Sequence, residues 1–173
     1  MICPDCGHDN IGGVDLCDAC GQPLVEFDPC GSPLEESISR HSISVLAPKV
    51  PTTVSSSSSV KDAIAEMVNR KIGCVLVVEG EQLVGVFSER DVLNKVSPDL
   101  KAVNRPVSDF MTPSPVTIRK QDSIAYALQA MDLGGYRHMP IVDEKGRPTG
   151  IISVRDILRF LCVRFAEIRS AAG

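Results

Sequence analysis

The sequence contains no tryptophan, and aromatic residues make up only 4% of its 173 residues. A hydrophobic core must therefore be aliphatic, and a hydrophobic content of 43% suffices for one or two small domains. No apolar run approaches the ~20 residues of a membrane-spanning helix, and the first residues do not resemble a signal peptide. These absences predict a cytoplasmic protein that has no membrane segment.

Positive charge is absent from the start of the chain. The first basic residue is Arg40, although many acidic residues precede it, and the net charge is −4. Because phosphate backbones repel an acidic segment, nucleic-acid binding there is disfavoured. The sequence also lacks a nucleophile paired with a base, a Walker phosphate-binding loop and an open metal site, so we expect no enzymatic activity.

One seven-residue phrase occurs twice. Residues 85–91 read GVFSERD and residues 150–156 read GIISVRD, which is an offset of 65 residues. Upstream, an offset of 64 pairs other apolar positions, such as Met67 with Met131. The extra residue falls in a glycine-containing turn at 143–146, where hairpins tolerate insertions. The chain therefore holds two copies of one supersecondary unit, which usually pack against each other.

Both copies predict the order strand, helix, strand, strand, helix. Apolar residues recur at helical spacing in the first helix of each copy, and short apolar runs follow as strands. The last helix runs to about residue 170. We expect a mixed α/β (α+β) fold with repeats at 44–100 and 107–165, after a segment at 1–24 and a linker at 25–43 that contains one helical turn. The serine run 55–59 is predicted to be a loop that caps a helix.

The repeated junction suits a nucleoside phosphate. Glycine lets a ligand approach the backbone, and the helix start offers unpaired N–H groups to a phosphate. The hydroxyl of Ser88 or Ser153 adds a donor, and the carboxylate of Asp91 or Asp156 can accept from two ribose hydroxyls. The alternative is that Ser-x-x-Asp merely forms a capping box, which stabilises a helix by ~1 kcal/mol without any ligand.

The joint pattern resembles the cystathionine-β-synthase (CBS) domain, and two in tandem resemble a Bateman module. The likeness covers roughly residues 44–165 and includes 137–143 (RHMPIVD) and 111–115 (MTPSP). It implies a homodimer and an adenosine ligand. In such a site a Ser or Thr lies near the phosphate, and an Asp binds the ribose hydroxyls. AMP, ADP and ATP are favoured, while NAD and S-adenosylmethionine stay open. The residues implied in binding are Thr53, Gly85, Ser88, Arg90, Asp91, Thr117, Arg137, His138, Pro140, Gly150, Ile151, Ser153, Arg155 and Asp156.

The two predicted sites are unequal. Arg137 and His138 resemble a basic pair that contacts phosphate in relatives, whereas their repeat partners are Gly73 and Cys74. We therefore expect the second repeat to bind phosphate better.

Two Cys-x-x-Cys-Gly knuckles lie near the start of the chain. Four thiolates at this spacing suit a tetrahedral structural zinc site, and the segment resembles a zinc ribbon. Disulfides are disfavoured by the expected compartment, while rubredoxin-like iron stays an alternative. The predicted ligands are Cys3, Cys6, Cys17 and Cys20. We expect His8 to be a surface residue, and Cys74 and Cys162 to lie in the core.

These patterns predict a non-catalytic regulatory or adaptor protein that senses an adenine nucleotide. Its acidic zinc ribbon would contact an effector protein that the sequence does not identify. A redox or metal sensor that uses the four-cysteine cluster is the alternative.

Overall fold

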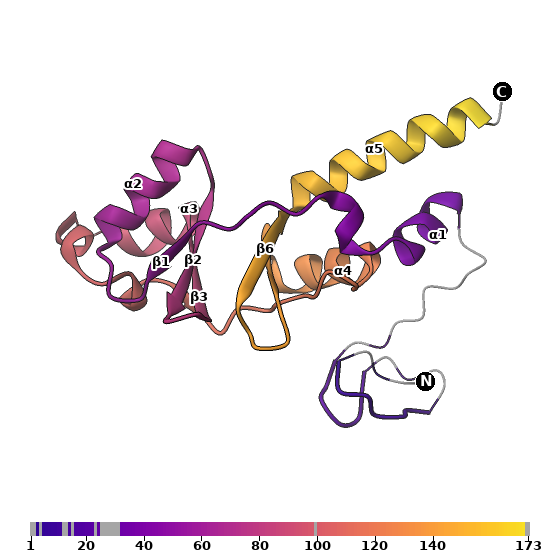
Figure 1. The fold of residues 1–173 in the computed structure, drawn as a ribbon, viewed down its shortest axis with the longest axis horizontal. Helices are drawn as coiled ribbons and strands as arrows, with labels where there is room; N and C mark the ends of the chain where they lie inside the picture. Colours follow the sequence, from indigo (N-terminus) through magenta and orange to yellow (C-terminus); the bar gives the residue numbers. More distant parts are fainter. Residues whose placement is uncertain are drawn as a thin grey trace.

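The computed structural model describes residues 3, 5–11, 14, 16–22, 24, 32–98 and 100–171. The two repeats lie side by side along the long axis of the molecule, and the cysteine-rich segment lies beside the second repeat (Figure 1). Part of the predicted linker, residues 25–31, lies outside the described residues, and this part includes Cys30. No helix among the described residues is long and apolar enough to cross a membrane.

The first repeat is built on a four-stranded sheet in the order β1-β2-β3-β4. Strand β1 (Thr53–Ser55) runs parallel to β2 (Cys74–Glu79), which pairs antiparallel with β3 (Gln82–Ser88). Helix α2 (Val60–Arg70) packs on this sheet, and Ser59 caps it by accepting a hydrogen bond from the backbone N–H of Asp62. The predicted serine cap is thus confirmed.

The second repeat has the same plan. Strands β5 (His138–Val142) and β6 (Pro148–Ser153) form the hairpin, and helices α4 (Ile124–Gly134) and α5 (Val154–Ala171) pack against it. The first strand of the predicted repeat order is reduced here to one parallel bridge between Ile118 and Ile141. Each repeat encloses a core of its own, made mostly of aliphatic side chains.

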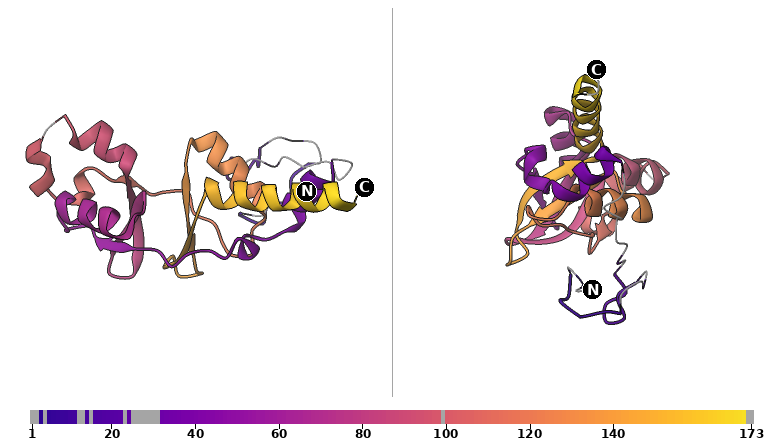
Figure 2. Two further views of the ribbon diagram at one scale, coloured as in Figure 1. Left: turned by 90° about the horizontal axis from the view of Figure 1, so that it is seen from above. Right: turned by 90° about the vertical axis from the view of Figure 1, so that its right-hand side faces the viewer.

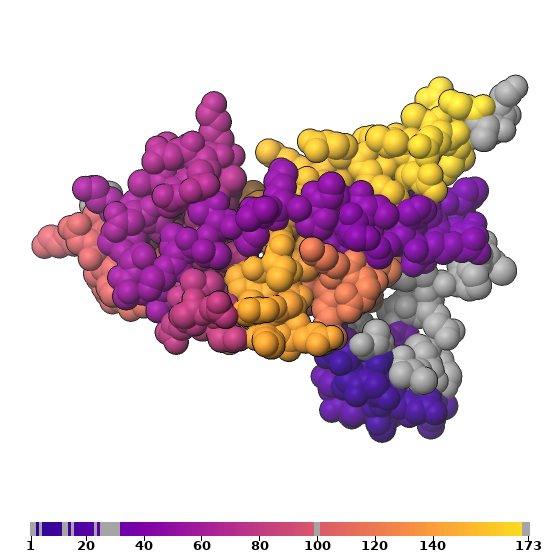
Figure 3. Space-filling model, viewed as in Figure 1, coloured from indigo at the N-terminus to yellow at the C-terminus, as the bar shows by residue number. Residues whose placement is uncertain are grey.

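The segment that enters each repeat pairs with the hairpin of the other repeat. Strand β4 (Thr112–Pro113) leads into the second repeat but pairs with β3 of the first. In the same way Lys49, which precedes the first strand of the first repeat, forms an antiparallel bridge with Ile151 of β6. The chain between α1 (Pro33–Arg40) and β1 accordingly crosses the second repeat (Figures 1 and 3). This exchange ties the two repeats together by a pseudo-twofold arrangement.

The junction glycines serve this crossing. A Cβ atom on Gly85 would overlap with the Sδ atom of Met111. A Cβ atom on Gly150 would lie 3.3 Å from the Cβ atom of Pro48 and 3.1 Å from the Cδ1 atom of Ile141. Each glycine therefore admits the entering segment of the other repeat. Close approach of the chain itself is thus a second reason for glycine here, beside the predicted approach of a ligand.

The helices differ from the prediction in two places. The linker contains a full helix, α1 (Pro33–Arg40), which begins with a capping box between Ser32 and Glu35 and packs on α4 and α5. The second helix of the first repeat is short. Its α-helical part, α3 (Glu89–Asp91), continues as a π-helical stretch, η2 (Val92–Val96), which ends the element. Pro98 has no backbone N–H with which to continue the helical hydrogen bonds beyond Ser97. Short 3₁₀ segments follow at η3 (Leu100–Asn104) and η4 (Val107–Asp109), and η1 (Ile43–Leu46) precedes β1.

Candidate functional site

Two clefts lie between the repeats, and each takes its residues from both. The first cleft, of about 170 Å³, joins Ser88 and Asp91 of the first repeat to residues 134–138 of the second. The second cleft, of about 390 Å³, joins Ser153 and Asp156 of the second repeat to residues 71–74 of the first. The repeat symmetry therefore places one serine-aspartate junction in each cleft.

Both junctions make the aspartate hydrogen bonds of the capping box that the sequence suggested as an alternative to a ligand site, and at Ser88 the box is complete. The Oδ2 atom of Asp91 accepts from the backbone N–H of Ser88 at 2.9 Å and from its hydroxyl at 2.7 Å. The Oδ2 atom of Asp156 accepts the same pair of bonds from Ser153, at 2.8 and 2.6 Å. One carboxylate oxygen of each aspartate thus accepts hydrogen bonds at the helix start. The other oxygen, Oδ1, is the atom that could accept hydrogen bonds from a ligand.

The two Oδ1 atoms have different surroundings. The Oδ1 atom of Asp91 lies 2.7 Å from the Nζ atom of Lys95 and accepts a longer bond of 3.4 Å from the hydroxyl of Thr112. Among the described residues, the Oδ1 atom of Asp156 has only a loose ion pair, at 3.8 Å, with the exposed Lys49. Asp156 therefore keeps acceptor capacity that it can offer to a ligand, whereas Asp91 has little left.

The second cleft is strongly cationic. Its acidic side chains are Glu89 and Asp156. Burial alone would raise the pKa of Asp156, but the hydrogen bonds from Ser153 outweigh it and lower the pKa below its ordinary value. The carboxylate is therefore ionised at neutral pH. The fixed positive charges that line the cleft are Lys49, Lys71, Arg137, Arg155 and Arg159.

His138 lies where the two clefts meet, and it lines both of them. Burial, and next the charge of Arg137, lower the pKa of His138 below its ordinary value, so the ring is neutral at pH 7. A Cβ atom on Gly73 would lie 3.2 Å from the Cε1 atom of this ring. The absence of a side chain at Gly73 thus lets the two repeats approach at this point.

The structure gathers most of the predicted binding residues in the clefts. We placed Arg137 and His138 at the second site alone, but they line both clefts. The first cleft also contains Ser88, Arg90 and Asp91, and the second contains Ile151, Ser153, Arg155 and Asp156. Five predicted residues lie outside the described linings of both clefts, namely Thr53, Gly85, Thr117, Pro140 and Gly150.

Sequence reasoning missed residues that the other repeat or its entering segment contributes. In the second cleft these are Lys49, Thr52 and Lys71, while Arg159, also missed, comes from α5 of the same repeat. Thr52 lies in the cleft in place of its predicted neighbour Thr53 because successive residues of an extended segment point in opposite directions. The basic character of Lys49 and Lys71 has no meaning in the sequence until the chain crossing is known, whereas Arg159 was readable from its position three residues after Asp156 on the same helix.

The four predicted metal ligands come together in the cysteine-rich segment (residues 1–24). All four Sγ atoms lie within 4.8 Å of one another. The Sγ atoms of Cys3 and Cys20 are 3.7 Å apart, and those of Cys6 and Cys17 are 3.6 Å apart. Sulfurs at about 2.3 Å from a tetrahedral zinc stand about 3.8 Å apart, whereas a disulfide would need about 2.05 Å. The donor set therefore fits a tetrahedral metal ion and excludes disulfides between these pairs.

Matching backbone turns support the two cysteine knuckles. The N–H of Gly7 donates to the carbonyl of Cys3 at 2.9 Å, and the N–H of Gly21 donates to that of Cys17 at 2.8 Å. Both glycines have positive φ angles, of 73° and 71°, which residues with a side chain rarely adopt. The turns therefore explain why each knuckle ends in glycine.

The remaining cysteines and His8 are only partly as expected. His8 is exposed and Cys74 is buried, as predicted. Cys162, predicted to lie in the core, is exposed, because α5 buries Ile157 on its inner face and turns Cys162 outward. The N-terminal segment contacts the second repeat through the side-chain amide of Gln22, which donates to the hydroxyl of Tyr126 on α4.

Comparison with known proteins decides the family. The sequence model of the CBS domain matches residues 44–98 and 107–163, which is more than half of the chain. The chain belongs to the CBS domain family. Its two repeats are the two CBS domains of a tandem pair, and the strand-helix-strand-strand order is that of solved CBS pairs.

Curated relatives share the CBS pair but differ elsewhere. An uncharacterized 17.7 kDa protein of Acidianus ambivalens is 30% identical over 60% of this chain and 62% of its own length. The CBS domain-containing protein CBSCBSPB1 of Arabidopsis thaliana is 30% identical over 69% of this chain and 22% of its own length. The chain thus spans less than two thirds of these relatives.

Solved CBS pairs have the same fold. A CBS domain protein of Pyrobaculum aerophilum complexed with AMP covers 73% of this chain and matches over 99% of its own, with a TM-score of 0.65 and 23% identity. The CBS pair of protein MJ0100, in complex with 5′-methylthioadenosine and S-adenosyl-L-methionine, covers 72% of this chain and matches over 98% of its own, with a TM-score of 0.66 and 22% identity.

Proposed function

We propose that this protein is a non-catalytic regulator that senses an adenine nucleotide through its CBS pair. The observation that carries the proposal is the second cleft, where an ionised Asp156 with a spare oxygen stands among fixed positive charges. A carboxylate oxygen accepts from ribose hydroxyls, and arginine and lysine bind phosphate. Helix α5, 18 residues long, begins at this junction and directs its positive dipole end toward the cleft. Adenosine ligands in solved CBS pairs support the same assignment.

The charge of the second cleft favours AMP, ADP or ATP over S-adenosylmethionine. The basic residues would repel the sulfonium and ammonium groups of S-adenosylmethionine. Each phosphate of a nucleotide, in contrast, adds attraction to these residues. We therefore expect ATP and ADP to bind more tightly than AMP, and S-adenosylmethionine most weakly.

A thermal-shift panel of these ligands tests the proposal. A ligand at 100 times its dissociation constant stabilises the folded chain by about 2.7 kcal/mol, which raises Tm by about 5–10 °C for a domain of this size. ATP should give such a shift, and 0.5 M salt should reduce it because salt screens the charged cleft. A shift with S-adenosylmethionine alone would contradict the proposed ligand class, and no shift with any adenosine ligand would contradict nucleotide sensing.

For the cysteine-rich segment we propose a structural zinc ion held by Cys3, Cys6, Cys17 and Cys20. Zinc would supply the folding energy of a segment whose apolar cluster contains only Cys3, Val14, Cys17 and Leu24 among the described residues. The sulfur distances support zinc, but a redox or metal sensor with iron at the same thiolates is the second candidate. We further propose a cytoplasmic location and an effector protein that contacts the acidic segment.

We also propose a homodimer in which α5 takes part. Helix α5 projects beyond the rest of the second repeat (Figures 1 and 2). Leu158 is 52% exposed and Phe165 is 53% exposed, which is unfavourable for side chains of this size. Light scattering at micromolar concentration should give twice the mass of one chain, and Phe165→Asp should shift it toward the monomer. A monomer mass for the unaltered protein would count decisively against this proposal.

A further inference from the structure

An aspartate that lines the first cleft is already paired with a basic side chain. Lys95 lies four residues after Asp91, on the π-helical stretch η2. Its Nζ atom lies 2.7 Å from the Oδ1 atom of Asp91, and it also donates to the backbone carbonyls of Phe110 at 2.9 Å and Met111 at 3.3 Å. An ammonium group has three donors, so Lys95 has spent all of them inside the protein.

These bonds also saturate Asp91. Its Oδ2 atom accepts two bonds from Ser88, and its Oδ1 atom accepts from Lys95 and Thr112. An ionised carboxylate has about four acceptor positions, and all four are filled. Asp91 is also buried, at 7% exposure, so a displaced Lys95 would leave an unpaired charge away from water. Two ribose hydroxyls therefore have to compete with bonds that are already made.

The equivalent lysine is missing from the second repeat. At the offset of 65 residues, Lys95 corresponds to Phe160, which lies beside the ring of His41 at a centroid distance of 5.3 Å. Asp156 consequently keeps its Oδ1 atom for a loose contact with Lys49 at 3.8 Å. The two junctions share their serine and aspartate but differ in this one position.

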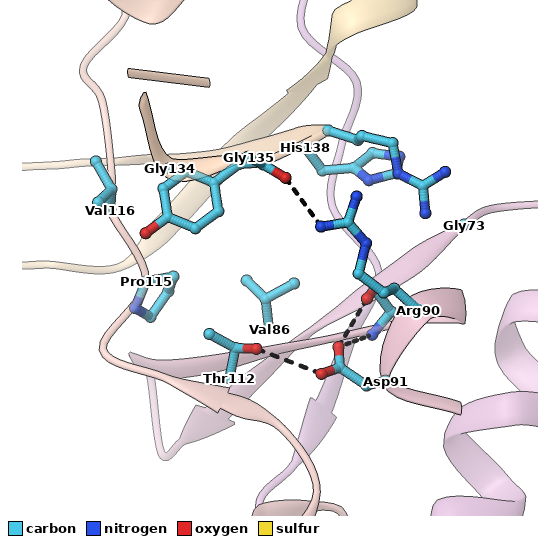
Figure 4. Close-up of a pocket in the computed structure, with 13 residues that line it drawn as sticks. Gly73, Val86, Arg90, Asp91, Thr112, Pro115, Val116, Gly134, Gly135 and His138 are labelled. Carbon is cyan, nitrogen blue, oxygen red and sulfur yellow. Dashed lines mark hydrogen bonds between the residues drawn. The ribbon is translucent and has the colours of Figure 1, made fainter. Parts of the chain in front are cut away.

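The side chain of Arg90 crosses the first cleft. The guanidinium of Arg90 donates to the carbonyl of Gly135 at 3.1 Å, and Figure 4 shows this bond spanning the cleft between Asp91 and the end of helix α4. Gly135 is the C-cap of α4, where a carbonyl and the negative end of the helix dipole attract a cation. Arg90 thus links the two repeats, and Lys95 holds the segment that enters the second repeat. Both use charged groups that would otherwise be available to a nucleotide.

We infer that Lys95 blocks the first cleft to nucleosides, so that the protein takes one nucleotide per chain, at the second cleft. This inference rests on the proposed function and adds the residue that determines the stoichiometry. The first cleft instead links the two repeats through the hydrogen bond from Arg90 to Gly135. The short α3, three residues long before η2 begins, also offers a phosphate a weaker helix terminus than α5 does.

Calorimetric titration of the full chain with ATP tests the inference. The unaltered protein should bind one equivalent per chain, and Lys95→Met should bind two, because methionine fills the space without occupying the Oδ1 atom of Asp91. Lys61→Met is the matched control, since Lys61 is exposed on α2, and it should still bind one equivalent. If Lys95→Met fails to fold, Lys95→Gln keeps N–H donors for the two carbonyls while removing the ion pair.

The outcomes separate this inference from the proposed function. Two equivalents bound by the unaltered protein, or one equivalent bound by a folded Lys95 variant, would overturn the role of Lys95. No heat from the unaltered protein with ATP, ADP or AMP would overturn nucleotide sensing itself. One equivalent rising to two is the only result that supports both.

Discussion

Asp156→Ala should weaken nucleotide binding about 100-fold or more. Two hydrogen bonds from ribose hydroxyls to a charged carboxylate contribute roughly 1.5–3 kcal/mol each, so their loss costs about 3 kcal/mol or more. The carboxylate is ionised and lies among basic residues that a ligand phosphate can reach. Calorimetric titration of the variant with ATP measures the loss directly.

Asp91→Ala is the matched control. It removes the same capping box from the equivalent helix start, so it also lowers stability by about 1 kcal/mol or more. Because Asp91 is engaged by Lys95, its loss should weaken nucleotide binding less than tenfold. Equal losses of affinity from the two variants would refute the asymmetry between the clefts. If neither variant changes affinity while both lose stability, the capping box explains the junction.

Removing the metal should unfold the cysteine-rich segment alone. Structural zinc contributes about 10 kcal/mol or more to such small units, and this one has only a minor apolar cluster of its own. The two CBS domains have separate cores, so they should stay folded when a chelator is added. Backbone amide NMR spectra, recorded before and after chelation, should lose only the dispersed signals of residues 1–24.

Elemental analysis supplies the control for this prediction. One zinc per chain is expected in the unaltered protein and in Cys162→Ser, since Cys162 is exposed on α5 and remote in the sequence from the cluster. Iron in place of zinc would favour the redox or metal sensor. Loss of the CBS domain signals on chelation would show that the metal stabilises the whole chain, contrary to the account.

The repeat and its junctions could be predicted from the sequence because their causes are local. The order of the elements follows from apolar spacing and turns, and the helix cap at Ser59 follows from a serine before a helical pattern. The two serine-aspartate junctions were visible as a repeated phrase. Local chemistry therefore determined which residues begin each helix and which carboxylates lie beside a cleft.

The composition of each cleft could not be predicted because it depends on how the chain crosses. Lys49 reaches Asp156 only because its segment pairs with β6 of the other repeat. The spacing of Asp91 and Lys95 was a readable signal, since residues four apart are neighbours on a helix. Its bonds to the carbonyls of Phe110 and Met111 require the tertiary structure. Surface exposure of Cys162 likewise depends on which face of α5 the repeat covers.

A structure determined from crystals grown with ATP tests most directly the central claim, that one nucleotide binds in the second cleft. The account predicts one nucleotide in the second cleft, with ribose hydroxyls within about 3 Å of the Oδ1 atom of Asp156 and phosphates toward the basic residues. Lys95 should still be bonded to Asp91. A nucleotide whose ribose lies on Asp91, or one bound outside the second cleft, would contradict the account.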